Sequence, residues 1–177
     1  MINFSVQSIP VVGTITEDTS VHALSCQEKR KIVRRTIVQQ RRNRKINLLE
    51  NLKSAALNAQ RHAYAPYSKF KVGAALEAND GNVYYGCNVE NAAYPLGQCA
   101  EATAIGSMIV QGATSIKQIV IASPTETYCY PCGGCRQKIA EFADKSTPVV
   151  MITPDGKSIS TTVGELLPQG FTLTPQR

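Results

Sequence analysis

The chain has 177 residues, of which 43% are hydrophobic and 18% charged, and its formal net charge at pH 7 is +6. This length suits one domain with a buried core and argues against a second full domain. No apolar run approaches the roughly 18 residues of a membrane helix, and the N-terminus lacks the charged start and apolar core of a secretory signal. We therefore expect a soluble, cytoplasmic protein without a membrane partner.

Residues 1–46 form an extension that shows no packing pattern at first and then becomes strongly basic. Nearly half of the basic side chains of the protein gather there: Lys29, Arg30, Lys31, Arg34, Arg35, Arg41, Arg42, Arg44 and Lys45. Beyond Glu50 the chain is almost neutral, so the positive charge belongs to the extension. We expect the extension to be either disordered or helical in its second half, and residues 47–177 to form the folded domain.

The predicted elements of that domain alternate between helices and strands. The folded part is expected to start near Ile46. Leucine and alanine then recur at helical spacing at 48, 49, 52, 55, 56 and 59, which predicts an amphipathic helix that ends before Pro66. Strands are expected at 71–78 and 83–87, joined by a tight turn at 79–82, because its Asp-Gly pair readily adopts positive φ angles.

A second group of elements follows a loop rich in Asn and Gly. We predict a helix at 99–111 closed by Gly112, a buried strand at 116–122 ended by Pro124, a helix at 132–143, a strand at 149–152 and a turn at 154–157. This alternation indicates a layered α/β domain.

The cysteines carry the most informative pattern in the sequence. Six cysteines are compatible with a disulfide framework, but a domain of this size does not need one, and the spacing of Cys129, Cys132 and Cys135 favours a metal. Cys132 and Cys135 are three residues apart and share one side of a helical turn. A helix N-terminus also favours thiolates, at this pair and at Cys99. We predict that two helix ends bring Cys99, Cys132 and Cys135 onto one Zn²⁺.

Three thiolates leave one corner of a tetrahedral zinc open for water, which is typical of a catalytic site. Glu101 lies about 200° around the helix from Cys99 and is interpreted as a proton carrier, not as a ligand. Two alternatives remain open. Cys129 also forms a Cys-x-x-Cys motif with Cys132, and a closed structural site could take Cys129 or Cys87 as its fourth ligand.

At these residues the chain resembles the cytidine deaminases, in particular the short-chain class whose zinc ligands are three cysteines. The resemblance runs from about Leu48 to Phe171. Besides the metal motifs at 98–101 and 131–137, it includes the segments 65–68, 72–76, 86–92, 94–97 and 164–168, together with Phe70. It implies a three-layer α/β/α fold with a mixed central sheet, and a catalytic domain at residues 47–177.

The resemblance implies hydrolytic removal of the 4-amino group of cytidine and deoxycytidine, which yields the uracil nucleoside and ammonia for pyrimidine salvage. It implies that zinc makes its water more acidic and that Glu101 carries protons first to N3 and then to the leaving amine.

Six further residues match positions that bind substrate in the family: Phe70, Asn88, Glu90, Tyr94, Ala100 and Phe171. Asn88 and Glu90 match the ribose positions, where an amide and a carboxylate can hydrogen-bond a 3′-hydroxyl, although such a pair can also be a polar loop anchor. Phe70 matches the aromatic residue that packs on the pyrimidine. Phe171 matches an aromatic residue that reaches the site of a neighbouring subunit, which implies a homotetramer.

One position departs from the family pattern. Three thiolates make zinc a poorer Lewis acid, and the family commonly offsets this with an arginine directly after the catalytic glutamate. Here that residue is Ala102. We expect a less acidic zinc water, with Arg136 and the helix dipoles as candidate compensation.

Three other functions remain open from the sequence. The basic extension suits a deaminase of RNA or DNA, but the Glu90 carboxylate would repel a 3′-phosphate, so we do not expect a nucleic-acid partner. A non-catalytic zinc-binding interaction module would not require Glu101. Deamination of a cytosine-containing antibiotic uses the same chemistry, but Asn88 and Glu90 favour a ribose.

Overall fold

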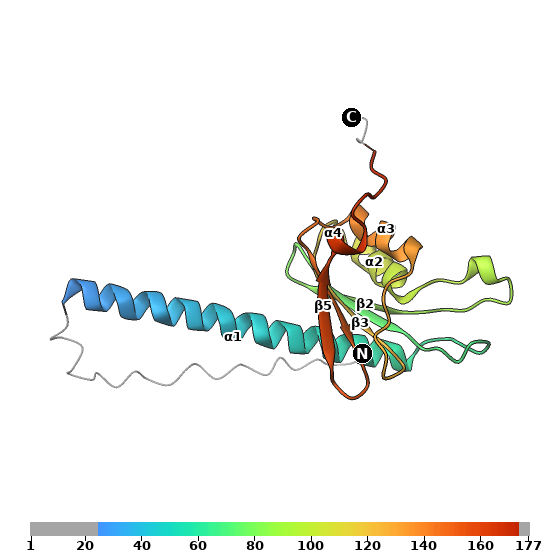
Figure 1. Cartoon of the computed structure of the whole chain (residues 1–177), viewed down its shortest axis with the longest axis horizontal. Coiled ribbons are helices and arrows are strands. Elements are labelled where there is room, and N and C mark those ends of the chain that lie inside the picture. The colour runs from blue at the N-terminus through green and yellow to red at the C-terminus, as the bar shows by residue number, and fades with distance from the viewer. Residues whose placement is uncertain (1–24, 174–177) are drawn as a thin grey trace, which may run out of the picture. The chain divides into compact units, whose positions relative to one another are not determined.

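The computed structural model describes residues 25–173, and the chain divides into two compact units, Met1–Arg44 and Lys45–Arg177. The elements, several of which are labelled in Figure 1, are α1 (Cys26–Arg61), β1 (Gly73–Ala78), β2 (Val83–Cys87), the 3₁₀ turn η2 (Tyr94–Leu96), α2 (Ala100–Val110), β3 (Ile116–Ala122), α3 (Gly133–Glu141), β4 (Pro148–Ile152), β5 (Ser158–Thr162) and α4 (Val163–Leu166). None of the described helices has the continuous apolar stretch that crossing a bilayer requires.

Helix α1 begins at Cys26, so the second half of the extension is helical, which is one of the two states that the sequence left open. A capping box closes its first turn: Ser25 N–H donates to Glu28 Oε2 at 2.8 Å, and Glu28 N–H donates to Ser25 Oγ at 3.3 Å. Neither Gly nor Pro occurs between residues 26 and 61, so nothing in the sequence interrupts the helix. Residues 26–61 therefore form one continuous helix, which includes the basic stretch.

The five strands form one mixed sheet in the order β2-β1-β3-β4-β5. Strands β3 and β4 are parallel, and the other three pairs are antiparallel. The β1–β2 hairpin turns at Gly81, whose φ of 83° confirms the positive angle predicted for the Asp-Gly turn. Strand β3 has the predicted bounds, and α3 ends at Glu141, before the predicted 143.

Helices cover both faces of the sheet, which confirms the three-layer α/β/α fold. On one face, Leu52 and Ala56 of α1 pack with Ala75, Val120 and Val150 of the sheet. On the other face the core includes residues of α2, α3 and α4, among them Ala104, Ile105, Met108, Ile139 and Val163, packed with Leu76, Ile119, Ile121 and Met151. Neighbouring residues of β1 alternate between the two cores, as a strand buried on both faces requires.

Two glycines let the layers approach closely. A Cβ atom at Gly73 would lie 2.0 Å from the carbonyl oxygen of Ala56 in α1, and one at Gly86 would lie 2.5 Å from the backbone nitrogen of Ala104 in α2. Both neighbours are backbone atoms, which cannot move aside as a flexible side chain would. Glycine at these strand positions therefore sets the separation between the sheet and its helices.

The register of the sheet gathers three loops at one end. Gly73 at the start of β1 pairs with Cys87 at the end of β2 and with Ala122 at the end of β3. The segment before β1, the loop after β2 and the loop after β3 therefore leave the sheet side by side. The loop after β2 leads to α2 and the loop after β3 leads to α3, so both helices start at this end of the sheet.

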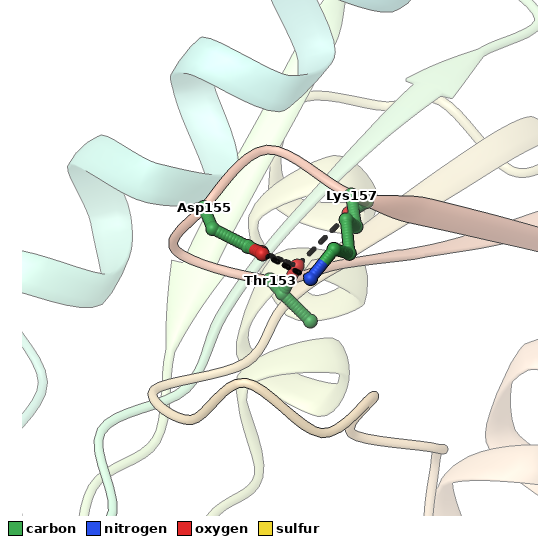
Figure 2. A network of polar contacts seen from close by, with 3 residues as sticks. All are labelled: Thr153, Asp155 and Lys157. Atoms are coloured by element: carbon green, nitrogen blue, oxygen red, sulfur yellow. Dashed lines mark hydrogen bonds and ion pairs between the residues drawn. The ribbon is translucent and has the colours of Figure 1, made fainter.

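The predicted turn between β4 and β5 is present, and a polar network closes it (Figure 2). Lys157 Nζ lies 2.6 Å from Asp155 Oδ2, and the Thr153 hydroxyl donates to the other carboxylate oxygen. These two hydrogen bonds lower the pKa of Asp155 to about 2. Strand β5, which follows, was not predicted, because its Ser-Ile-Ser-Thr-Thr sequence is largely polar and exposed at the edge of the sheet.

Replacing Gly86 with alanine should lower the free energy of unfolding by about 1–3 kcal/mol, because the added Cβ meets the backbone of α2. Gly106 in the same helix is the matched control: a Cβ there meets no atom within 4 Å, and Gly106→Ala should stabilise by up to about 1 kcal/mol. Urea denaturation followed by circular dichroism measures both changes. Equal stability of the two variants would contradict the close contact.

Candidate active site

Two helix N-termini meet at the end of the sheet where the three loops leave it. Cys99 is the N-cap residue of α2, and Cys132 is the N-cap residue of α3. Neither side chain forms a capping hydrogen bond in the described structure, so both sulfurs are available to another partner. Cys135 lies in the first turn of α3 and is buried.

The three predicted ligands come together. The sulfur atoms of Cys99, Cys132 and Cys135 all lie within 4.8 Å of one another, and those of Cys99 and Cys132 are 3.9 Å apart. Zinc–sulfur bonds of about 2.3 Å at tetrahedral angles place two sulfurs about 3.8 Å apart. The cluster therefore has the size and the chemistry that a zinc ion requires.

A closed four-cysteine site finds no support in the described part of the chain. The group of residues close enough to share a metal contains Cys99, Cys132 and Cys135, and neither Cys87 nor Cys129 belongs to it. Cys129 instead packs against the hydrophobic core, and burial raises the pKa of its thiol to about 11. The ambiguity between the two overlapping Cys-x-x-Cys motifs thus resolves toward the later pair.

Glu101 lies in the first turn of α2 and is only 4% exposed. The Cys135 thiol donates to Glu101 Oε2 across 3.3 Å, so the carboxylate lies against the sulfur cluster. This burial distinguishes Glu101 from the exposed glutamates that merely complement a helix dipole. A buried carboxylate beside a metal cluster is placed to exchange protons there.

Burial and hydrogen bonds shift the thiols in opposite directions. Burial, reinforced by the nearby Glu101 carboxylate, raises the pKa of Cys135, and burial likewise raises the pKa of Cys99. Burial also acts to raise the pKa of Cys132, but hydrogen bonds from Cys135 and Cys99 outweigh it, and the pKa of Cys132 is lowered. Cys132 is thus the thiol of the three that ionises most readily.

A cavity of about 550 Å³ opens beside the cluster. Its lining residues come from the segment before β1 and the loop after β2: Tyr67, Ser68, Asn88, Val89, Glu90, Asn91, Tyr94, Gly97, Gln98 and Cys99. Cys99 belongs both to this lining and to the metal cluster. A molecule in the cavity would therefore reach the metal.

The Glu90 carboxylate is held by the segment before β1. It accepts hydrogen bonds from the backbone N–H of Tyr67 at 2.9 Å, from that of Ser68 at 3.2 Å, and from the Ser68 hydroxyl. The hydroxyl bond is the largest of the influences that lower the pKa of Glu90. Ser68 was not singled out from the sequence. The signal was its place in a turn, where a serine commonly bonds a nearby polar group.

Asn88 anchors the same loop. Its Oδ1 accepts from the Val72 N–H at 2.8 Å, and its Nδ2 donates to the Phe70 carbonyl at 2.8 Å. The loop-anchor role left open by the sequence is therefore present. An amide group has two donor hydrogens and two acceptor lone pairs, so one donor and one acceptor remain for a ligand.

The other predicted substrate residues lie in different places. Tyr94 lines the cavity, is 78% exposed, and meets the Tyr67 ring edge-on at 6.3 Å between centroids. Phe70 and Ala100 are not among the lining residues; Ala100 is buried at the start of α2. Phe171 is 69% exposed, and Gln137 of α3 holds its backbone through two hydrogen bonds.

Arg136 does not pair with a thiolate. Its Nε donates to the Pro131 carbonyl at 2.9 Å, and its Nη1 donates to the Leu166 carbonyl at 3.2 Å. The guanidinium thus fixes the loop that carries Cys132 against the end of α4. Ala102 is buried on α2, and the reduced acidity expected from its lack of a positive charge stays a prediction.

Comparisons with known proteins agree with this geometry. The family model for the cytidine and deoxycytidylate deaminase zinc-binding region matches residues 46–151. A cytidine deaminase of Sporosarcina psychrophila is 46% identical over 123 residues, which cover 70% of this chain and 90% of that protein. A cytidine deaminase of Halalkalibacterium halodurans is 43% identical over 117 residues, which cover 66% of this chain and 89% of that protein.

Solved structures give the same result. The crystal structure of a cytidine deaminase from Burkholderia pseudomallei superposes with a TM-score of 0.66 at 44% identity, covering 69% of this chain and 98% of that one. The crystal structure of a cytidine deaminase from Mycobacterium tuberculosis superposes with a TM-score of 0.61 at 34% identity, covering 71% of this chain and 98% of that one. The matched family region begins after the basic stretch of α1.

We expect one zinc ion per chain, measured by inductively coupled plasma mass spectrometry after gel filtration. Cys135→Ser should bind less than a tenth of that amount, because a serine hydroxyl does not replace a buried thiolate. Cys129→Ser is the matched control and should retain the full amount, since Cys129 lies outside the cluster. Loss of zinc from the control, or its retention by Cys135→Ser, would refute the three-ligand assignment.

Proposed function

The chain belongs to the cytidine and deoxycytidylate deaminase family, and we propose that it hydrolyses cytidine and deoxycytidine to uridine and deoxyuridine with release of ammonia. The observation that carries the proposal is the junction at Cys99, a residue shared by the metal cluster and the cavity. The buried carboxylate of Glu101 lies against this cluster. A nucleoside in the cavity would thus have its base within reach of both.

Cys99, Cys132 and Cys135 would hold the zinc ion. When bound, zinc supplies a nucleophile at neutral pH by lowering the pKa of a coordinated water. The cluster leaves room for that water because Cys87 and Cys129 do not complete it. The N-termini of α2 and α3 stabilise the negative charge of the thiolates.

Glu101 is the proposed proton carrier. Deamination adds water across the N3=C4 bond of the base, so that hydroxide joins C4 and a proton joins N3. The amino group then leaves as ammonia when the proton of the new C4 hydroxyl reaches its nitrogen. The Glu101 carboxylate can take a proton from the attacking water and deliver it, because burial in the first turn of α2 holds it beside the cluster.

Glu90 and Asn88 are the proposed ribose partners. The cradle formed by Tyr67 and Ser68 keeps Glu90 ionised, and an ionised carboxylate accepts a hydrogen bond from a 3′-hydroxyl. The same charge repels the 3′-phosphate of a polynucleotide. The site therefore favours free nucleosides over cytosine within RNA or DNA.

Assembly and location follow as further parts of the proposal. Phe171 and Tyr94 are large, exposed side chains on the catalytic unit, and their exposure supports a homotetramer in which Phe171 completes a neighbouring cavity. Light scattering coupled to gel filtration tests the tetramer. Five cysteines of the catalytic unit, Cys87, Cys99, Cys129, Cys132 and Cys135, carry free thiols, which supports a reducing location such as the cytoplasm.

Glu101→Gln should reduce the kcat for cytidine by a factor of about 10³ or more while zinc content is unchanged, because the amide cannot carry protons. The loss of cytidine absorbance measures kcat. The matched control is Glu141→Gln, an exposed glutamate at the end of α3, which should keep full activity. A Glu101→Gln variant that retains activity would exclude Glu101 as the proton carrier. An RNA strand with an internal cytidine, assayed alongside, should not react.

Ser68→Ala should raise KM for cytidine about tenfold and leave kcat within about twofold, because the hydroxyl positions Glu90 and does not touch the reacting atoms. The variant should also shift the acidic limb of kcat/KM to higher pH, since loss of the hydrogen bond that lowers the pKa of Glu90 lets that pKa rise toward its ordinary value. Ser54→Ala, an exposed serine on α1, is the control. A fall in kcat with an unchanged KM would show that Ser68 has another role.

A further inference from the structure

The first half of α1 carries a concentration of positive charge that the deamination site does not use. Nine of the 19 Lys and Arg residues of the chain lie between residues 29 and 45, and all nine side chains are exposed. Between residues 26 and 45 the one acidic residue is Glu28. Its carboxylate is occupied by the N–H of Ser25 in the capping box. This part of the helix therefore presents a net charge that its own residues do not balance.

No ion pair within residues 25–173 involves these nine side chains, because the two present there join Lys53 to Glu50 and Lys157 to Asp155. The basic residues instead stand next to one another along the helix. Three pairs are four residues apart: Arg30 with Arg34, Lys31 with Arg35, and Arg41 with Lys45. Each such like-charge pair destabilises the helix. A bound polyanion would remove this repulsion.

The distribution of side chains around the helix distinguishes between possible polyanions. At 100° per residue, the nine basic side chains cover about 240° of the circumference. Val33, Ile37 and Val38 lie among them and do not form a separate face. A helix that lies on a membrane needs a continuous apolar face opposite its basic one, and a coiled coil needs an apolar seam. The strip free of basic residues is instead largely polar, with Ile32, Thr36, Gln39 and Asn43.

We propose that residues 26–45 of α1 bind double-stranded nucleic acid through its phosphates, without reading the base sequence. About 20 helical residues span about 30 Å, the length of about nine base pairs. Six of the nine cations are arginines, whose guanidinium groups bind phosphate oxygens in a bidentate manner. This proposal departs from our sequence-based expectation of no nucleic-acid partner, which rested on the repulsion between Glu90 and a 3′-phosphate in the cavity. The helix binds a polymer that the cavity does not deaminate.

The test is fluorescence anisotropy of the full zinc-loaded chain with labelled 20-base-pair DNA and RNA duplexes of mixed sequence, titrated between 50 and 200 mM salt. The wild-type chain should bind both duplexes. R34Q/R35Q/R41Q/R42Q should bind at least tenfold more weakly at 100 mM salt. Its plot of log Kd against log salt should be less steep by about 3.6, since each of the four lost phosphate contacts removes about 0.9 from the slope. Cytidine deamination by this variant should equal that of the wild-type chain, which shows that the catalytic unit is folded.

Two further variants sharpen the result. R34K/R35K/R41K/R42K preserves the charge and should keep the wild-type salt slope. K117Q/K138Q removes exposed charge from the catalytic unit and should leave duplex binding unchanged. The proposal is overturned if the wild-type chain binds neither duplex at 50 mM salt, if the four-glutamine variant binds as tightly as the wild-type chain, or if phosphatidylserine vesicles bind the chain more tightly than either duplex does.

Discussion

The confinement of negative charge at one point dominates this structure. Three cysteine sulfurs lie within 4.8 Å of one another, and a buried carboxylate lies against them. Burial raises the pKa of Cys99 and Cys135, so a bound cation favours their thiolates by taking the place of the protons. The unpaired N–H groups of two helix starts contribute the remaining positive potential. Packing of the domain holds these groups together. Gly86 sets the distance between α2 and the sheet, and Arg136 fixes the loop before α3.

The substrate side of the site depends on sheet register in the same way. Because Gly73 pairs with both Cys87 and Ala122, the segment before β1 lies beside the loop after β2. Asn88 then bonds the backbone of Phe70 and Val72, and Ser68 bonds Glu90. These contacts form a rigid polar wall that ends at Cys99, where the cavity meets the metal cluster. A single structural device, the shared end of three strands, thus supplies both the groups that recognise a ligand and those that act on it.

The sequence was most informative where function depends on local spacing. Cys132 and Cys135 are three residues apart at a helix start, and this pattern can be read without knowledge of tertiary contacts. The Asp-Gly turn and the apolar strand β3 were likewise predicted correctly from local sequence. The features that the sequence did not predict have one property in common: each depends on contacts with residues distant in the chain. Ser68 is significant only because register brings it to Glu90, and the polar strand β5 exists because β4 offers it an edge. The long helix α1 was divided at Ile46 because its basic half lacks the apolar spacing that marked the remainder.

The hydrogen bonds that leave α3 affect the order in which the protein can mature. Arg136 joins the loop of Cys132 to the Leu166 carbonyl, and the adjacent Gln137 joins the same helix to Phe171. Both acceptors lie 30 or more residues later in the chain than the side chains that bind them. The ligand loop therefore acquires this restraint only after the segment 166–171 has been synthesised, although all three thiols emerge earlier. A nascent chain that stops before Leu166 therefore contains all three thiols but lacks this restraint on the loop of Cys132.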